Sequence, residues 1–437
     1  MCQGTGCPCS HEGLVMPVRY LVNARLLTMA GPNRPRRGEE MRDLGVIENG
    51  WLSIEGEKIS GIGSGPLTEP VEGTVLDLGG RVVLPTWIDC HTHACWSGSR
   101  LEEFEAGLRG VEYLEILKQG GGIMSTVRAV RATSQEELTE LLHARLGRML
   151  TFGTTAMEVK SGYGLDTENE LKMLRAIHAA SREQDVLILG TFLGAHAKDP
   201  EVPDYVDRLI SETLPAVAEE FPGICCDAYC EEGAWTVDET CRLFRAASDL
   251  GCTLRVHADQ FNSLGMTSAA IDMGATSVDH LEAVSESDVT RLGESSTIAV
   301  LLPGSGFSLD QRYAPGRDLI DAGASVAIAT NYNPGSAPSP SMPMTVALAC
   351  RRCGLLPSEA ITAATHNAAH VLGIGDHHGR LEAGMRADLQ VLDCQDEREL
   401  AWEFATTPPP LVLCKGGVVQ FLGDAEFEGG EDDGEPS

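Results

Sequence analysis

Residues 84–93 read LPTWIDCHTH, an apolar run that ends in two histidines, His91 and His93, one residue apart. Side chains two residues apart in a β-strand point to the same side, so both imidazoles can reach one metal ion. A divalent metal lowers the pKa of bound water and so makes it a nucleophile near neutral pH. This stretch therefore predicts a metal-dependent hydrolase whose histidines lie at the end of a barrel strand.

The composition limits the classes of partner. The chain has 437 residues, of which 43% are hydrophobic, and this length suits a barrel with a smaller domain. The formal net charge of −31 argues against nucleic acid and anionic membrane surfaces as partners. No uncharged apolar stretch approaches about 18 residues, so we expect no membrane span. No signal-peptide pattern precedes the 14 cysteines, and this favours a cytoplasmic location.

Hydrophobic patterning divides the chain into five parts. We expect a flexible leader at residues 1–17 and an acidic, disordered tail at 424–437. Short β-type runs at 18–83 and again at 376–423 predict one composite β-sandwich domain. Residues 84–375 alternate strand-like and helix-like segments, and this predicts an α/β fold, a (β/α)8 TIM-type barrel.

Polar residues follow the predicted barrel strands, at the edge where barrel enzymes place their active sites. They are His91 and His93, residues 160–164, His196, and residues 257–260, 279–282 and 331–336. One histidine after a strand is usually a satisfied polar residue, but six polar segments at separate strand ends indicate a site. Metal hydrolysis needs three or four nitrogen or oxygen ligands, and His91, His93 and His257 supply three nitrogens. A carboxylate at a later strand end is expected to complete the set.

The order of these motifs resembles the amidohydrolase superfamily and, within it, the imidazolonepropionase family. The similar segments are HTH at 91–93, SGSR at 97–100, YLEI at 113–116, GGGI at 120–123, STVR at 125–128, KSGYGL at 160–165, HADQ at 257–260, NPGS at 333–336 and GMRAD at 384–388. The resemblance covers roughly residues 19–417. A lone His-x-His pair is a weak signal, whereas this set is specific.

The resemblance implies a reaction, a cofactor and a set of site residues. The reaction is hydrolytic ring opening of 4-imidazolone-5-propanoate, a small anionic substrate, to N-formimino-L-glutamate in histidine degradation. The cofactor is one divalent metal, zinc or iron, and the assembly is a homodimer. The implied metal ligands are His91, His93, His257 and the residue at 331. The implied catalytic residues are His280, Gln260 and Asn331, and the implied substrate-binding residues are Arg100, Tyr113, Tyr163, His196, Gln260, Asn333, Gly335 and Ser336. Among these, Arg100 suits the propanoate, because a guanidinium can hold a carboxylate through two hydrogen bonds.

Position 331 departs from the family pattern. The family has Asp there, as metal ligand and base, whereas this chain has Asn331. An amide can offer an oxygen to a metal, but it brings no charge and does not accept a proton. Loss of a general base costs about 10²–10⁴-fold in rate, so we expect reduced activity with His280 as base. Gln260 is expected to hydrogen-bond the substrate.

Three alternatives follow from the same residues. Asn331 is compatible with a weakened or inactive homologue that binds ligand without turnover. An amidohydrolase acting on another small cyclic amide or amidine, such as a deaminase, is opposed by Arg100 and by the 160–164 segment. For Lys160, carbamylation to bridge two metals competes with a supporting role beside Tyr163, and the motif favours the supporting role.

Overall fold

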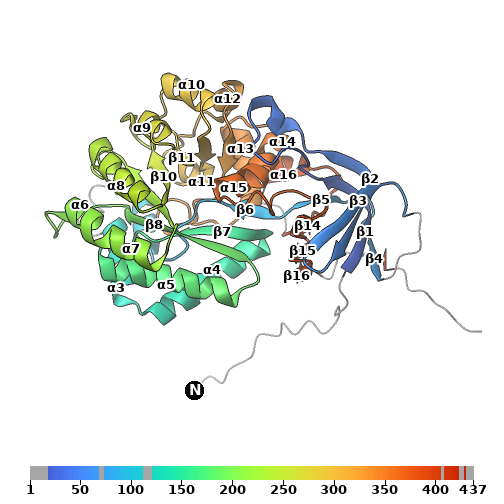
Figure 1. The fold of residues 1–437 in the computed structure, drawn as a ribbon, viewed down its shortest axis with the longest axis horizontal. Helices are drawn as coiled ribbons and strands as arrows, with labels where there is room; N and C mark the ends of the chain where they lie inside the picture. Colours follow the sequence, from blue (N-terminus) through green and yellow to red (C-terminus); the bar gives the residue numbers. More distant parts are fainter. Residues whose placement is uncertain (1–17, 68–72, 112–120, 405–407, 423–427, 430–437) are drawn as a thin grey trace, which may run out of the picture.

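The computed structural model describes residues 18–67, 73–111, 121–404, 408–422 and 428–429. The expected leader at 1–17 lies outside the described residues. The ribbon shows a barrel surrounded by helices, with a β domain on one side (Figure 1). Within the described residues, no helix is both long and apolar enough to cross a membrane.

The larger sheet is the predicted barrel. Its strands are β6 (Trp87–Asp89), β7 (Thr154–Lys160), β8 (Leu187–Ala195), β9 (Cys225–Cys230), β10 (Thr253–Ala258), β11 (Ser277–His280), β12 (Ile298–Leu301) and β13 (Val326–Ile328). Each pairs in parallel with the next in chain order. A parallel bridge between Thr92 and Tyr332 joins the first strand's end to the last one's, which brings the barrel close to closure. The fold class is confirmed.

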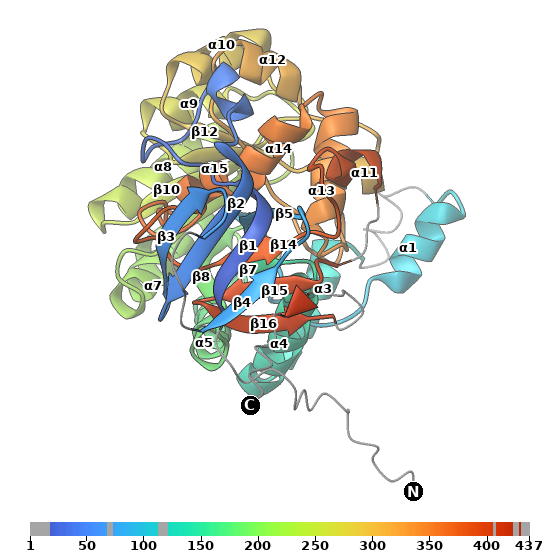
Figure 2. The same ribbon diagram turned by 90° about the vertical axis from the view of Figure 1, so that its right-hand side faces the viewer.

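The helices are arranged mostly around the outside of the barrel, and α1 projects away from it (Figures 1 and 2). They are α1 (Leu101–Leu108), α3 (Ile123–Ala132), α4 (Gln135–Thr151), α5 (Thr167–Glu183), α6 (Tyr205–Arg208), α7 (Leu214–Glu220), α8 (Val237–Asp249), α9 (Met266–Asp272), α10 (Glu286–Glu294), α11 (Pro303–Ser308), α12 (Gly316–Asp321), α13 (Met342–Arg352), α14 (Pro357–Ala364), α15 (His366–Val371) and α16 (Glu399–Trp402), with a 3-10 turn at Gly38–Arg42 and a π turn at Leu209–Thr213. Side-chain caps fix several starts: Asp166 accepts a hydrogen bond from the backbone of Asn169 and begins α5. The apolar face of α5, including Met173 and Ile177, is buried in the core.

The smaller sheet joins the two ends of the chain. Its strands are β1 (Val18–Leu27), β2 (Val46–Glu55), β3 (Lys58–Ser64), β4 (Thr74–Asp77), β5 (Val82–Pro85), β14 (Leu389–Val391), β15 (Leu411–Cys414), β16 (Gly417–Phe421) and β17 (Glu428–Gly429). The order is β16-β15-β14-β5-β1-β2-β3, with β4 paired to β1 and β17. Pairing of Gln390 in β14 with Leu84 in β5 brings late and early segments together, as the sequence predicts. A separate apolar core that includes Leu26, Leu52 and Leu413 fills this domain.

The strands of the small domain are joined by hydrogen bonds through β1. The ten-residue strand β1 pairs with β4 near its start and with β5 near its end, so its strands form one continuous sheet. Leu84 and Pro85 belong to this sheet, slightly past the expected boundary at residue 84. Within the expected tail, Glu428–Gly429 pair with β4 because that edge strand offers free backbone groups.

Candidate active site

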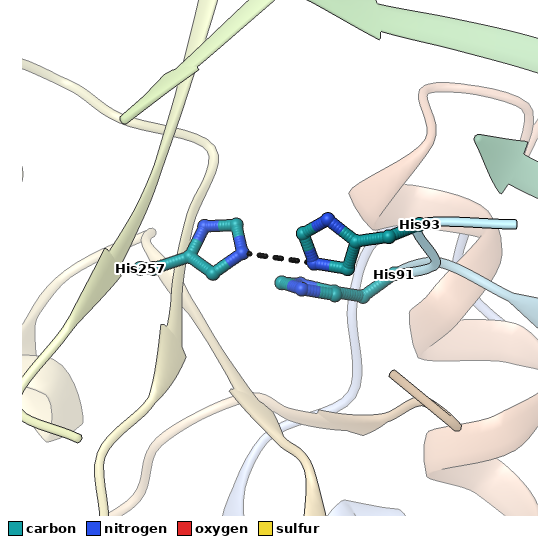
Figure 3. Close-up of side chains that lie close together, drawn as sticks. All are labelled: His91, His93 and His257. Atoms are coloured by element: carbon teal, nitrogen blue, oxygen red, sulfur yellow. Dashed lines mark hydrogen bonds between the residues drawn. The ribbon is translucent and has the colours of Figure 1, made fainter. Parts of the chain in front are cut away.

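The three predicted metal ligands meet at the carboxyl ends of their strands. His91 and His93 follow β6, and His257 lies in β10. One ligand atom from each residue falls within 4.8 Å of the others, and all three side chains are buried. The Nε2 atoms of His93 and His257 are 3.3 Å apart. Figure 3 shows His257 reaching toward the other two rings from the opposite side.

Buried atoms without partners show that these residues fit a metal ion. Nε2 of His91 and Oδ1 of Asn331 are buried and have no hydrogen-bond partner among the described residues. Burial lowers the pKa of His91, His93 and His257, which keeps their imidazoles neutral with a lone pair available. Neutral imidazole nitrogens and an amide oxygen are ligands for a divalent metal, and unpaired buried polar groups are costly without one.

Asn331, the predicted fourth ligand, is buried beside the end of β6. Its backbone N–H donates to the carbonyl of His91 at 3.1 Å, so residue 331 lies directly beside the end of β6. Its side chain is 2% exposed, and Nδ2 donates to Oγ of Ser305 at 2.7 Å. The backbone is in the left-handed region, with φ of 53°, which Asn tolerates better than most residues.

Carboxylates orient two of the three histidines. Nδ1 of His91 lies 2.5 Å from Oδ2 of Asp279, and Nδ1 of His257 lies 3.0 Å from Oδ1 of Asp227. When Nδ1 donates its proton to a carboxylate, the lone pair lies on Nε2, so the tautomer and ring orientation suit metal binding. Sequence reasoning gave no role to Asp227, because it missed β9, where this residue lies.

Lys160 and Arg255 connect these carboxylates inside the barrel. Nζ of Lys160 lies 2.7 Å from Asp227 and 2.8 Å from Glu158. The guanidinium of Arg255 lies 2.6 Å from Glu158 and 2.7 Å from Asp279. All five side chains are buried, so the network links both histidine-bound carboxylates through two cations.

The network keeps the Lys160 ammonium paired with two buried carboxylates. Burial and Arg255 lower the pKa of Lys160, but Asp227 and Glu158 outweigh them, so the pKa is raised and the ammonium stays charged. Lys160 therefore pairs with Asp227, the carboxylate that contacts His257, and its supporting role beside Tyr163 stays a prediction. Charged residues inside apolar strand runs, such as Glu158 and Arg255, were the overlooked signal.

His280 and Gln260 lie close to the histidine cluster. His280 ends β11, and its ring centroid is 5.5 Å from that of His257. Nδ1 of His280 lies 3.1 Å from Oε1 of Glu282, and both side chains are buried. Oε1 of Gln260 accepts a hydrogen bond from the hydroxyl of Tyr229 at 2.9 Å, so its amide is oriented from β9. Neither Glu282 nor Tyr229 was singled out from the sequence.

The rings of two predicted substrate-binding residues, His196 and Tyr163, pack beside His93. The ring of His196 stacks on His93 with centroids 4.8 Å apart, and Tyr163 lies 5.2 Å from His196. Nδ1 of His196 donates to the carbonyl of Gly162 at 3.1 Å. Burial lowers the pKa of His196 to about 3 and raises that of Tyr163. Both rings are therefore neutral and suit a flat, uncharged ring.

The remaining predicted residues lie around Arg100. A Cβ atom added to Gly335 would lie 3.6 Å from Nη1 of Arg100, so the 333–336 turn is next to the guanidinium. Arg100 pairs with Glu103 at 2.5 Å, and its Nε is buried without a partner. Oδ1 of Asn333 accepts from the backbone N–H groups of Gly335 and Ser336, so Asn333 shapes this turn. Tyr113 lies outside the described residues.

A cavity of about 550 Å³ lies at the opposite end of the barrel. Cys225 and Thr253 line it at the starts of β9 and β10, and none of the three ligand histidines does. Glu158 and Arg255 line it too, so the buried charge network lies between this cavity and the histidines. We therefore place the site at the carboxyl ends of the strands.

A parallel barrel with neutral, carboxylate-oriented histidines at its carboxyl end is the arrangement of a metal-dependent hydrolase. Residues 82–436 match the model of the Amidohydrolase family. The chain is 41% identical to the imidazolonepropionase of Herpetosiphon aurantiacus, over 91% of this chain and 95% of that protein. It is 44% identical to the imidazolonepropionase of Symbiobacterium thermophilum, over 92% and 97% respectively. The chain therefore belongs to the amidohydrolase family and, within it, to the imidazolonepropionases.

Solved structures share the fold at low sequence identity. A 5-methylcytosine deaminase from Klebsiella pneumoniae aligns with a TM-score of 0.70 and 16% identity, over 92% of this chain and 98% of that one. An adenosine deaminase from Xanthomonas campestris with bound zinc gives a TM-score of 0.66 and 15% identity, over 93% and 94%. These likenesses extend over both the barrel and the small sheet.

Proposed function

We propose that this chain hydrolyses 4-imidazolone-5-propanoate to N-formimino-L-glutamate in histidine degradation. The observation that carries the proposal is its identity of about two fifths with imidazolonepropionases over nine tenths of its length. The residues of the site are consistent with this substrate. Buried neutral histidines lie beside the flat rings of Tyr163 and His196, and Arg100 lies next to the 333–336 turn. The substrate has matching parts, which are a ring amide and a carboxylate.

His91, His93, His257 and Asn331 would hold the metal, through three nitrogens and one amide oxygen. A bound zinc or iron ion supplies Lewis acidity, which activates water and polarises the ring carbonyl. Asp279 and Asp227 hold the imidazoles of His91 and His257 in the required orientation. Asn331 carries no charge, so the metal site has no anionic ligand at position 331. An Asp at this position would provide one.

His280 is the group we assign to proton transfer. Its Nδ1–H donates to Glu282, which leaves the lone pair on Nε2 free to accept a proton from the attacking water. Glu282 then stabilises the imidazolium that forms, and the same Nε2 returns the proton to the leaving ring nitrogen. Asn331 has no oxygen able to accept a proton at useful pH, so this task falls to His280.

Arg100 is proposed to bind the propanoate, and Tyr163 and His196 to contact the imidazolone ring. Nε of Arg100 is buried without a partner, so the guanidinium has hydrogen-bonding capacity left. Its position next to Gly335 supports binding of the propanoate near the 333–336 turn. Gln260 and Ser336 offer further hydrogen bonds at this face of the barrel. Tyr113 stays a prediction.

The test is hydrolysis of 4-imidazolone-5-propanoate by metal-loaded protein, followed as loss of its ultraviolet absorbance, beside Asn331→Asp. We expect turnover by both proteins, faster in Asn331→Asp. Turnover only in the variant would identify a scaffold whose native base position is disabled. Absence of turnover by both proteins would reject this substrate and favour another cyclic amide.

We also propose zinc or iron as the resident metal, a homodimer and a cytoplasmic location. The donor set of imidazoles and an amide oxygen suits either metal. Elemental analysis of protein purified without added metal identifies the ion, and light scattering during gel filtration gives the mass. A monomeric mass would reject the homodimer.

A further inference from the structure

Every polar group of Asn331, in the backbone and in the side chain, has a hydrogen-bond partner among the described residues except Oδ1. The backbone N–H donates to His91, and the carbonyl accepts from Nδ2 of Asn333 at 2.6 Å. Nδ2 of Asn331 donates to Oγ of Ser305 at 2.7 Å. Oδ1 alone is buried with no partner. In the structure the Ser305 hydroxyl therefore occupies the Nδ2 end of this amide, and Oδ1 is the end left for the site.

Ser305 is placed by a close approach of α11 to the segment after β13. A Cβ atom on Gly304 would lie 3.2 Å from the carbonyl oxygen of Thr330, so the neighbouring glycine lets the helix approach the backbone before Asn331. Ser305 is 1% exposed, and its backbone N–H donates to Leu302. The hydroxyl is thus fixed by packing and by helical hydrogen bonding.

We infer that Ser305 is the positioning residue for the fourth metal ligand, because it holds Nδ2 and leaves Oδ1 for the metal. This inference rests on the proposed metal site. An amide has only one oxygen able to bind a cation, and its nitrogen lone pair is delocalised. A reversed amide would direct N–H groups toward the metal and remove the ligand.

The same serine matters less when the ligand is a carboxylate. A carboxylate has two equivalent oxygens, so either orientation offers a ligand atom. A serine hydroxyl can donate as well as accept, so it can pair with a carboxylate by turning its hydrogen. Asn331 thus offers a ligand atom only in the orientation in which Nδ2 faces Ser305, whereas Asp would offer one in either orientation.

The experiment is a double-mutant cycle read as metal affinity of metal-free protein. Ser305→Ala is made with Asn331 and in the Asn331→Asp background, and the dissociation constant for Zn²⁺ is measured by competition with a chromophoric chelator. With Asn331 we expect weakening of about tenfold or more, typical of groups that orient a metal ligand. In the Asn331→Asp background we expect less than about threefold, because only a neutral hydrogen bond is lost.

Two controls separate this role from folding. Ser325→Ala removes a hydroxyl from a buried serine at the opposite end of β13 and should leave the dissociation constant unchanged. Ser305→Cys keeps the volume but offers a weaker acceptor, so we expect an intermediate loss with Asn331. Thermal unfolding of each metal-free variant checks that the fold persists.

Each outcome decides one question. A larger loss with Asn331 than in the Asn331→Asp background supports the positioning role. Equal losses in both backgrounds, or no loss from Ser305→Ala and Ser305→Cys, would overturn it while leaving the metal site intact. Absence of stoichiometric Zn²⁺ binding by the unmodified chain would instead reject the metal site on which the inference rests.

Discussion

Nδ1 of His91 lies 2.5 Å from Oδ2 of Asp279, and both side chains are fully buried. Arg255 contacts the same carboxylate oxygen, so Asp279 joins a metal-ligand histidine to the barrel's internal charges. This contact links metal affinity to residues that never reach the metal.

Replacing Asp279 with Asn should weaken metal binding. The variant loses the carboxylate charge that fixes the tautomer of His91. Loss of a hydrogen-bond partner of a metal-binding histidine typically lowers metal affinity about 10–100-fold. The measurement is Zn²⁺ affinity by chelator competition. Asp310→Asn, in an exposed ion pair with Arg312, is the matched control and should leave affinity unchanged. An unaltered dissociation constant in Asp279→Asn would count against the orienting role.

Replacing Arg255 with Met should destabilise the fold. Two buried carboxylates, Glu158 and Asp279, lose their shared cation, and breaking a buried pair costs about 3–5 kcal/mol. Urea unfolding of metal-free protein measures the free energy of unfolding. The control is Arg398→Met, whose side chain is 75% exposed and should change stability by less than about 0.5 kcal/mol. Equal effects of the two substitutions would contradict this prediction.

Replacing Arg100 with Ala should raise KM about 10–100-fold with normal metal content. The physical reason is loss of charge-assisted hydrogen bonds to the propanoate, worth about 1.5–3 kcal/mol. Steady-state kinetics and elemental analysis check the two parts. Arg109→Ala, at the exposed end of the same helix α1, is the control. Unchanged KM in Arg100→Ala would remove this residue from the substrate site.

Acid should destabilise the protein partly through His366, the first residue of α15. Burial lowers the pKa of His366 to about 3, and its Nε2–H donates to the carbonyl of Arg34. The unfolded chain binds a proton at His366 near pH 6.5, whereas the folded chain does not until about pH 3. Above pH 6.5 the neutral His366 therefore costs the folded state no stability. Between pH 6.5 and about pH 3 the free energy of unfolding falls by about 1.4 kcal/mol per pH unit, because only the unfolded chain binds the proton.

The check is urea unfolding of metal-free protein at pH 7 and pH 5. His366→Gln should lose less stability between these two pH values than the unmodified chain does. His178→Gln, at an exposed position in α5, should behave as the unmodified chain. The same pH dependence in all three proteins would show that His366 does not contribute.

The order of local patterns already predicted most of the fold and three metal ligands. Strand and helix periods are properties of neighbouring residues, so the alternation from residue 84 onward predicts the barrel. The His91-Thr92-His93 spacing places two imidazoles on one side of a strand end, whatever surrounds them. The departure at Asn331 was also visible, because it depends only on which residue stands there.

Only the tertiary structure decided which buried charges meet. Asp227 on β9 contacts His257 on the neighbouring strand β10, and Asp279 on β11 reaches His91 after β6, a strand with which β11 does not pair, because the barrel directs these side chains into one interior. A hydrogen bond between side chains forms only when the donor–acceptor distance falls within a window of a few tenths of an ångström. The spacing of residues in the sequence does not specify positions to that precision. The orientation of the Asn331 amide is of the same kind, since it follows from where α11 places Ser305.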